Sequence, residues 1–351
     1  MEYLKDVLAA LSVILNGLPQ GLLALSFGFA SIPTALAFIV GAAGCLLFSC
    51  VAPISFQAET ITLAGTMGKN MQERLSMIFF GAAAMATIGI FGFLEKIVTF
   101  VGPAITNGMM AGVGIMLARV AFGMADKNKA VGFSSIASGF LTYMMTKDLV
   151  YTITLSVVLS SVVAVALKQK SNMGAEEKKG LTLQKPILNL AVARGALAMV
   201  CLNIGANIAF GKITGNIAGA NVNVDHLAIY SSLADMASSL FGGGPVEAII
   251  SATGSAPHPI FSGVLMMTLM AIILFAGLLP KIGRYVPSES IAGFLFVLGA
   301  IVTVPINASS ALGGGDAVVG GVTMTVTAIS DPFLGMMAGL IVKCISPLVG
   351  I

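Results

Sequence analysis

Two glutamates in apolar surroundings carry the strongest chemical signal in this sequence. Glu247 ends the run LFGGGPVE at residues 240–247, and Glu59 lies in the polar stretch PISFQAETIT at residues 53–62. A carboxylate at membrane depth is costly and usually marks a pathway or a binding site. Pro245 suits the first position of a helix, so we expect a helix to begin there with Glu247 in its first turn. We predict a substrate site at Glu247, the alternative being a carboxylate that only caps a helix start.

The elements that hold these glutamates must be membrane spans. The chain has 351 residues, of which 57% are hydrophobic and 9% charged, and its mean hydropathy is +0.99. So few charges over this length predict a multi-pass protein of the cell membrane, surrounded by lipid. The four cysteines lack metal-ligand spacing and no basic patch suggests nucleic acid. The two histidines are isolated and no phosphate loop is evident, so we expect no enzyme, no metal and no cofactor.

The chain divides into two halves that resemble each other. Residues 168–185 are the longest hydrophilic stretch, with five lysines and two glutamates. They predict a first repeat at 1–168, a loop at 169–185 and a second repeat at 186–351. A shift of 185 residues overlays residues 92–101 on 277–286 and places Gly114 on Gly299. If each half has seven segments, the second is inverted in the membrane, and inverted repeats place the site at their interface near the midplane.

Each half contains one broken element that carries a glutamate. Residues 53–68 are too short and polar to span ~30 Å of hydrocarbon as a plain helix, so we expect an extended piece that runs into a half-helix. Glu59 either shares the substrate site or satisfies backbone donors there. We expect the first segment to be interrupted at residues 16–21 (NGLPQG), because a proline removes a helical hydrogen bond.

Further polar or aromatic side chains near these breaks are candidates for contact with a substrate. Phe56 would stack on a flat ring or simply pack, and the amide side chains would bind substrate or join helices by hydrogen bonds. The candidates besides the two glutamates are Ser55, Phe56, Gln57, Asn16, Gln20, Asn203, Asn207 and Gly244.

The layout resembles the nucleobase–cation symporter-2 family, the xanthine/uracil permeases with their hypoxanthine/guanine branch. Residues 240–247, followed by Gly254, are similar to the tenth segment of that family, and residues 100–114 to its fifth. The resemblance implies an all-α polytopic fold of fourteen segments as a 7+7 inverted repeat, with short strands in segments three and ten. It also implies uptake of a purine or pyrimidine base, often with a proton, in which Glu247 hydrogen-bonds the base.

The sequence also departs from that family, and an alternative stays open. Ala248 stands where the family usually has asparagine, and the eighth segment offers Asn203 and Asn207, or Asp235 in another register, in place of an acid or a histidine. Residues 19–21 (PQG) look like the sulfate permease family, so the alternative is a small-anion transporter without a cytosolic regulatory domain. The site elements contain glutamates and no Lys or Arg, which argues against an anion.

The family resemblance also gives expectations for the coupling ion, the oligomeric state and the orientation in the membrane. We expect H⁺ as the coupling ion, with Na⁺ as the alternative, and a homodimer is a further expectation. The positive charges of the 168–185 loop place that loop inside and both termini outside, whereas the family pattern places both termini inside. The orientation therefore stays open.

Overall fold

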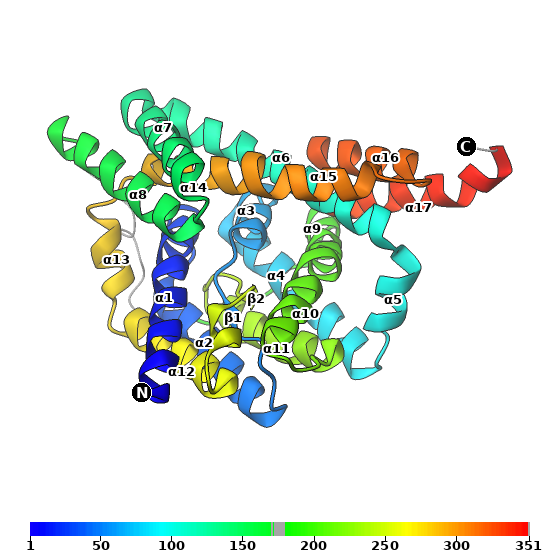
Figure 1. Cartoon of the computed structure of the whole chain (residues 1–351), viewed down its shortest axis with the longest axis horizontal. Helices are drawn as coiled ribbons and strands as arrows, with labels where there is room; N and C mark the ends of the chain where they lie inside the picture. The colour runs from blue at the N-terminus through cyan, green and yellow to red at the C-terminus, as the bar shows by residue number, and fades with distance from the viewer. Residues whose placement is uncertain (170, 172–179, 350–351) are drawn as a thin grey trace. The chain divides into compact units, whose positions relative to one another are not determined.

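The computed structural model describes residues 1–169, 171 and 180–349. The described chain is helical apart from two short strands, each of two residues (Figure 1). Six of the described helices are long and apolar enough to cross a membrane, and shorter apolar helices accompany them. The protein is therefore a multi-pass integral membrane protein, as the composition predicts.

The chain forms two compact units, and each unit takes segments from both halves of the sequence. Unit 1 consists of Met1–Glu95, Ser171–Ala196 and Asn207–Val286, and unit 2 of Lys96–Lys170, Leu197–Ala206 and Pro287–Ile351. The units therefore do not coincide with the predicted repeats, whose boundary stays a prediction. Of the predicted loop at 169–185, residues 170 and 172–179 lie outside the described residues.

Unit 1 holds both strands and the helices around them. In chain order its elements are α1 (Glu2–Ser26), α2 (Ser31–Leu47), β1 (Ile54–Ser55), α3 (Ala58–Met67), α4 (Met71–Ile90), α10 (Ile208–Ile217), α11 (Val224–Ser239), β2 (Glu247–Ala248), the 3-10 turn η2 (Ala252–Ser255), α12 (Pro259–Phe275) and α13 (Leu278–Gly283). Three elements contribute residues to both units, namely α5 (Leu94–Val101), α9 (Leu190–Leu202) and the π-helical turn η1 (Asn203–Asn207).

Unit 2 is built around α6 and contains helices only among its described residues. Its elements are α6 (Pro103–Lys127), α7 (Lys129–Thr146), α8 (Leu149–Ala166), the 3-10 turn η3 (Ser288–Ile291), α14 (Ala292–Phe296), the π-helical turn η4 (Val297–Thr303), α15 (Val304–Leu312), α16 (Ala317–Ile329) and α17 (Pro332–Val349). Glycines bring α6 close to its neighbours: a Cβ added at Gly108 would lie 2.5 Å from the Gly320 carbonyl oxygen of α16. Membrane helices associate through such small residues.

Residues that the repeat makes equivalent lie against each other. A Cβ added at Gly114 would be 3.0 Å from the Gly299 carbonyl oxygen, and one added at Gly299 would be 2.5 Å from the Gly114 oxygen. The strands β1 and β2, from the two broken elements, also pair with each other, and they do so antiparallel. Contacts of a residue with its own equivalent are expected at a two-fold axis. The structure thus agrees with a 7+7 inverted repeat with short strands in the broken elements.

The first segment is a single helix, so the predicted interruption at residues 16–21 is wrong. Helix α1 continues through Pro19. The side chain of Gln20, the next residue, donates from Nε2 to the Asn16 carbonyl oxygen of the same helix at 3.4 Å. Prolines are tolerated inside membrane helices where other groups satisfy the freed backbone.

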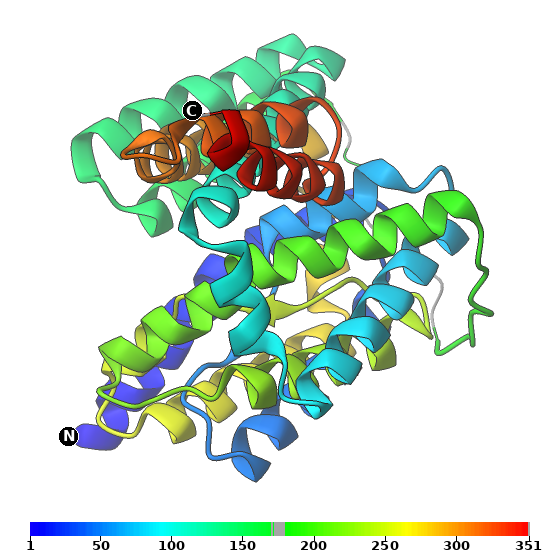
Figure 2. The same ribbon diagram turned by 90° about the vertical axis from the view of Figure 1, so that its right-hand side faces the viewer.

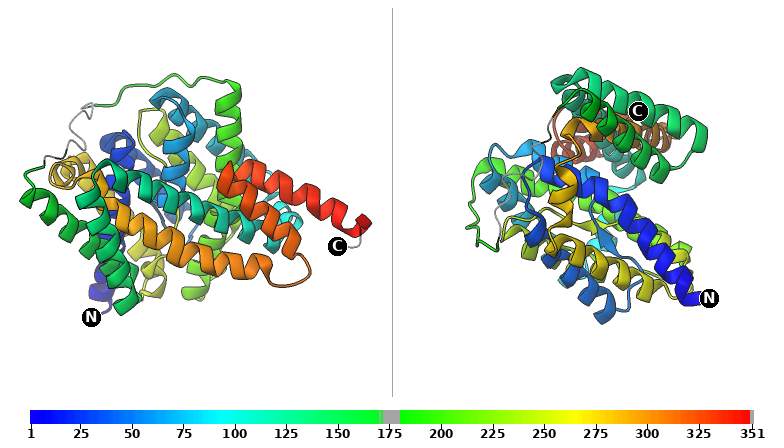
Figure 3. Two further views of the ribbon diagram at one scale, coloured as in Figure 1. Left: turned by 90° about the horizontal axis from the view of Figure 1, so that it is seen from above. Right: turned by 90° about the vertical axis from the view of Figure 1, so that its left-hand side faces the viewer.

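The start of α1 is joined to the start of α12, and the two helices lie side by side (Figure 3, right). The backbone N–H of His258 donates to Asp6 Oδ1 at 2.9 Å, and His258 Nδ1 lies 2.8 Å from Asp6 Oδ2. The hydroxyl of Ser262 donates to the Asp6 carbonyl oxygen at 2.8 Å. The second broken element, which precedes α12, is thereby anchored to α1 at its far end.

We expect Gly44→Ala to destabilise unit 1, because a Cβ added at Gly44 in α2 would lie 2.3 Å from Tyr230 Cβ in α11. Overpacking of this kind costs about 1–3 kcal/mol. The measurement is the thermal unfolding midpoint of the purified protein in detergent. Gly123→Ala in α6 is the matched control, because nothing lies within 4 Å of a Cβ added there. Equal midpoints for the two variants would contradict close α2–α11 packing.

Candidate functional site

The two broken elements meet in a short antiparallel ribbon inside unit 1. Ile54 lies opposite Ala248, and Ser55 lies opposite Glu247. The ribbon lies between α1 and α2 on one side and α10 and α11 on the other (Figure 1). Side chains of directly opposite residues share a face of an antiparallel pair. Ser55 and Glu247 therefore share one face, while Ile54 packs on the other, where a Cβ at Gly41 of α2 would lie 2.5 Å from Ile54 Cδ1.

Glu247 lies in a strand and not in the first turn of a helix, so the helix predicted from Pro245 is wrong. Pairing with β1 competes with the local helix signal, and the only helical turn that follows β2 before α12 among the described residues is η2, of four residues. Thr214 of α10 supports this irregular backbone: its hydroxyl donates to the Ile249 carbonyl oxygen at 2.8 Å and accepts from the Ser251 N–H at 3.0 Å.

Gln57 joins the two broken elements. Its Nε2 donates to the Ala248 carbonyl oxygen at 3.2 Å, and its Oε1 accepts from the Thr60 hydroxyl at 2.8 Å. The Ile249 N–H donates to the Pro53 carbonyl oxygen at 3.4 Å. The N–H and C=O groups of nonhelical backbone at membrane depth need hydrogen-bond partners from the protein. The Gln57 amide is one such partner, for the Ala248 carbonyl oxygen.

The glycine run makes the turn that brings β2 into place. Gly242 has a φ of +95°, which favours glycine. The Gly244 N–H donates to the Thr34 hydroxyl at 2.8 Å, and its carbonyl oxygen accepts from the Ser238 hydroxyl at 2.7 Å. Through these two hydrogen bonds, Gly244 fixes the turn that comes just before β2.

A second acid, Asp235 of α11, lies beside the strand that carries Glu247. Both residues are 2% exposed. Asp235 Oδ1 accepts the Val246 N–H at 2.7 Å, which places its carboxyl group beside the residue that precedes Glu247 in the chain. Sequence reasoning considered Asp235 only as an alternative in the eighth segment. The sequence feature that points to Asp235 is its position inside the apolar stretch 226–240, since an acid at membrane depth marks a candidate site just as the two glutamates do.

Glu59 lies in the first turn of α3, just after β1. It is buried. The N–H groups of a first helical turn lack intrahelical partners and favour negative charge. The two roles expected for Glu59, contact with a substrate and satisfaction of these backbone donors, both stay predictions.

Two buried polar atoms near the ribbon lack hydrogen-bond partners among the described residues, namely Ser55 Oγ and Asn16 Oδ1. Helix α1 approaches β1 here, since a Cβ added at Gly17 would lie 3.1 Å from Ser55 Oγ. Buried polar atoms are nearly always hydrogen-bonded, so each exception needs an explanation.

Phe56 lies in the core of unit 1. Its ring packs edge to face on Phe38, with centroids 5.3 Å apart, and against α1 at Gly21. Asn203 and Asn207 lie in η1, which continues α9 into α10 without a break (Figure 2). Asn203 Nδ2 donates to the Met199 carbonyl oxygen at 3.2 Å. Asn203 belongs to unit 2, whereas every other predicted site residue belongs to unit 1.

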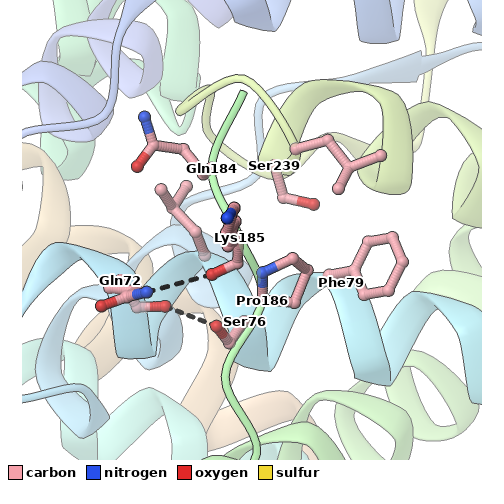
Figure 4. A pocket seen from close by; sticks show the side chains of 9 residues that line it. Gln72, Ser76, Phe79, Gln184, Lys185, Pro186 and Ser239 are labelled. Carbon is pink, nitrogen blue, oxygen red and sulfur yellow. Dashed lines mark hydrogen bonds between the residues drawn. The ribbon is translucent and has the colours of Figure 1, made fainter. Parts of the chain in front are cut away.

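A small pocket lies elsewhere in unit 1, between the start of α4 and the end of α11 (Figure 4). Gln72 Nε2 donates to the Lys185 carbonyl oxygen, and the Ile187 N–H donates to Ser76 Oγ, both at 3.0 Å. These contacts hold the extended stretch that leads into α9. The pocket contains none of the predicted site residues. Within the described ranges, no group of three or more His, Cys, Asp or Glu residues could hold a metal ion.

Comparisons with known proteins identify the fold. Neither the protein-family models nor the curated proteins gave a match. Among solved structures, the transmembrane domain of a cyanobacterial bicarbonate transporter, BicA, aligns with a TM-score of 0.69 at 12% identity, over 97% of this chain and 98% of that one. Two structures of SLC26A9 align with a TM-score of 0.71. The first is 13% identical over 99% of this chain and 66% of that one. The second, the murine anion transporter in its inward-facing state, is 14% identical over 99% and 68%.

The resemblance to the nucleobase–cation symporter-2 family is therefore corrected. The solved structures named above, which share this fold over nearly the whole chain, are anion transporters of a different family. The glycine–proline run and the glutamate that suggested nucleobase permeases form a turn and a strand in this chain. At 12–14% identity the likeness establishes the fold of a membrane transporter, and the substrate has to be argued separately.

We expect Thr34→Val to destabilise the turn that places Glu247. The change removes the acceptor of the Gly244 N–H, and an unsatisfied buried donor costs about 1–3 kcal/mol. The measurement is again the thermal midpoint. Thr87→Val is the matched control, because the Thr87 hydroxyl only donates to the Ala83 carbonyl oxygen of its own helix at an exposed position. A Thr34→Val midpoint as high as the control's would contradict this role.

Proposed function

We propose that this protein is a secondary active transporter of small anions, and that it moves its substrate without converting it chemically. The observation that carries the proposal is the alignment of 97% of the chain with the transmembrane domain of BicA, a bicarbonate transporter. The alignment of 99% of the chain with the anion transporter SLC26A9 supports it further. The alternative function derived from residues 19–21 thus becomes the leading one.

The ribbon offers groups that suit a small anion. The first-turn N–H groups of α3 begin at Ala58, directly after β1, and a helix N-terminus attracts negative charge. Ser55 Oγ, which is buried beside this backbone without a partner among the described residues, adds a further donor. We assign substrate contact to Ser55 and to the start of α3, with Asn16 as the neighbouring polar group on α1.

The acids beside the ribbon restrict how an anion could enter. Glu59, Asp235 and Glu247 are all buried in unit 1. A negatively charged substrate added to ionised carboxylates would be repelled, since two unit charges 8 Å apart at an effective dielectric constant of 20 interact by about 2 kcal/mol. A cation that enters with the anion removes this repulsion. We therefore propose coupled uptake of the anion with H⁺, with Na⁺ as the competing coupling ion.

The first experiment is thermal stabilisation of the purified protein by a panel of sulfate, bicarbonate, small carboxylates and nucleobases. A ligand that binds only the folded state adds about 2.7 kcal/mol at a concentration of 100 Kd. We expect a rise in the midpoint with at least one anion and none with a nucleobase. Uptake of that anion into proteoliposomes then tests transport. A midpoint shift with a purine or pyrimidine alone would overturn the proposal.

We expect Glu59→Gln to tighten binding of the anion by on the order of tenfold, because a like charge is removed from the start of α3. The measurement is the Kd from the concentration dependence of the thermal midpoint. Glu95→Gln is the matched control, since Glu95 lies in the same unit but is exposed and pairs with Lys212 at 2.9 Å. An unchanged or weaker affinity in Glu59→Gln would contradict an anion site beside α3.

A further inference from the structure

Helix α6 of unit 2 carries a positive charge inside the membrane, at Arg119. The helix has 25 residues and ends at Lys127. At 1.5 Å per residue it is about 37 Å long, and Arg119 lies about 12 Å before its end. The hydrocarbon core is ~30 Å thick, so a helix that starts at one boundary projects about 7 Å beyond the other. Arg119 then still lies about 5 Å inside the hydrocarbon, and a tilt of the helix places it deeper.

The face of α6 that carries Arg119 is covered in one half of the helix and open in the other. Gly112, Arg119 and Gly123 lie within about 40° of one another around the helix axis, at 3.6 residues per turn. A Cβ added at Gly112 would lie 2.5 Å from Thr327 Cβ of α16, whereas no atom of the described residues lies within 4 Å of a Cβ added at Gly123. Helix α16 has only 13 residues, too few to cross the hydrocarbon. It covers this face at Gly112 and leaves it open around Arg119.

The open face leaves the guanidinium of Arg119 without a protein partner. The residue is exposed, and no hydrogen bond or ion pair joins its side chain to the part of the chain that the structure describes. Lys343 of α17, another cation inside a helix of unit 2, donates to the Phe100 and Val101 carbonyl oxygens at 2.8 and 3.2 Å. Charged side chains at bilayer depth are costly, and those that are kept usually line the pathway of an ion or a substrate.

The direction of the side chain argues against contact with a lipid phosphate. The Cα–Cβ bonds of a helix tilt toward its N-terminus, and long side chains continue in that direction. The membrane boundary nearer to Arg119 lies toward the C-terminal end of α6, at Lys127. The side chain of Arg119 therefore starts toward the middle of the membrane and away from the nearer headgroups.

Resting on the proposed transport of a small anion, we propose that Arg119 lines a water-filled pathway and binds the transported anion there. The guanidinium presents parallel N–H donors that match two oxygens of one anion, so the ligand class is a small oxyanion such as a carboxylate or bicarbonate. Arg119 also supplies a positive charge that the broken elements lack, since residues 53–62 and 240–247 contain acids and no Lys or Arg. A fixed charge of this kind concentrates its counter-ion in a pathway.

Cysteine accessibility tests the water-filled pathway without requiring transport. The background is Cys344→Ser, because Cys344 is the exposed native cysteine and the other three are buried. Arg119→Cys in proteoliposomes is treated on both sides of the membrane with a charged, membrane-impermeant thiol reagent. Only the thiolate reacts, and apolar surroundings keep a thiol protonated. We expect rapid labelling of Arg119→Cys, and a thermal midpoint equal to that of the background checks its folding.

Val158→Cys is the matched control for labelling. Val158 is 50% exposed in the middle of α8, a helix without charged side chains, so we expect it to face lipid and to stay unlabelled. Labelling of Arg119→Cys no faster than that of Val158→Cys would overturn the proposal, because Arg119 would then face lipid.

Uptake into proteoliposomes tests the ligand. We expect Arg119→Gln to raise the oxyanion concentration for half-maximal uptake at least tenfold, and Arg119→Lys, which keeps the charge, to raise it less. Lys127→Gln is the matched control, because it removes a positive charge from the exposed end of the same helix and should leave that concentration unchanged. Unchanged half-saturation in Arg119→Gln, or inhibition by chloride as strong as by the unlabelled oxyanion, would overturn the proposal. If the native protein takes up no anion, the proposed function fails, while labelling still decides whether Arg119 faces water.

Discussion

The pairing of β1 with β2 is the constraint on which the rest of unit 1 depends. Two residues from each half leave the helical conformation, so their backbone groups need partners that water cannot supply inside a bilayer. The strands satisfy one another, and Gln57, Thr34 and Thr214 satisfy the backbone at either end. Polar side chains concentrate around the ribbon for that reason, which creates the conditions for a binding site.

The acids around this ribbon differ in their environments. Glu59 lies in the first turn of α3, directly after β1. Glu247 lies in β2, opposite Ser55 of β1. Asp235 of α11 accepts the Val246 N–H, one residue before Glu247. Three buried acids from three different elements therefore gather around the ribbon.

The likeness to BicA and SLC26A9 covers nearly the whole chain, yet identity is only 12–14%. In this chain the two broken elements pair, and equivalent glycines such as Gly114 and Gly299 approach closely. Those features are requirements of backbone packing and tolerate wide changes of side chain. Function belongs to sites whose side chains vary on a shared fold, and the fold alone does not assign a substrate.

Composition and the spacing of apolar stretches were sufficient to predict a multi-pass membrane protein with two related halves and a broken element in each. Those properties depend on hydrophobicity and on where helices cannot continue, and both are local. The secondary structure after Pro245 is not determined by local sequence. The local pattern predicts a helix, but these residues pair with β1, which lies almost 200 residues earlier in the chain. Pro19 did not act as a break, and α1 continues through it. The hydrogen bond from the Val246 N–H to Asp235 and the burial of Ser55 in the ribbon were decided only by the tertiary structure, because α11, β1 and β2 acquire their proximity through packing.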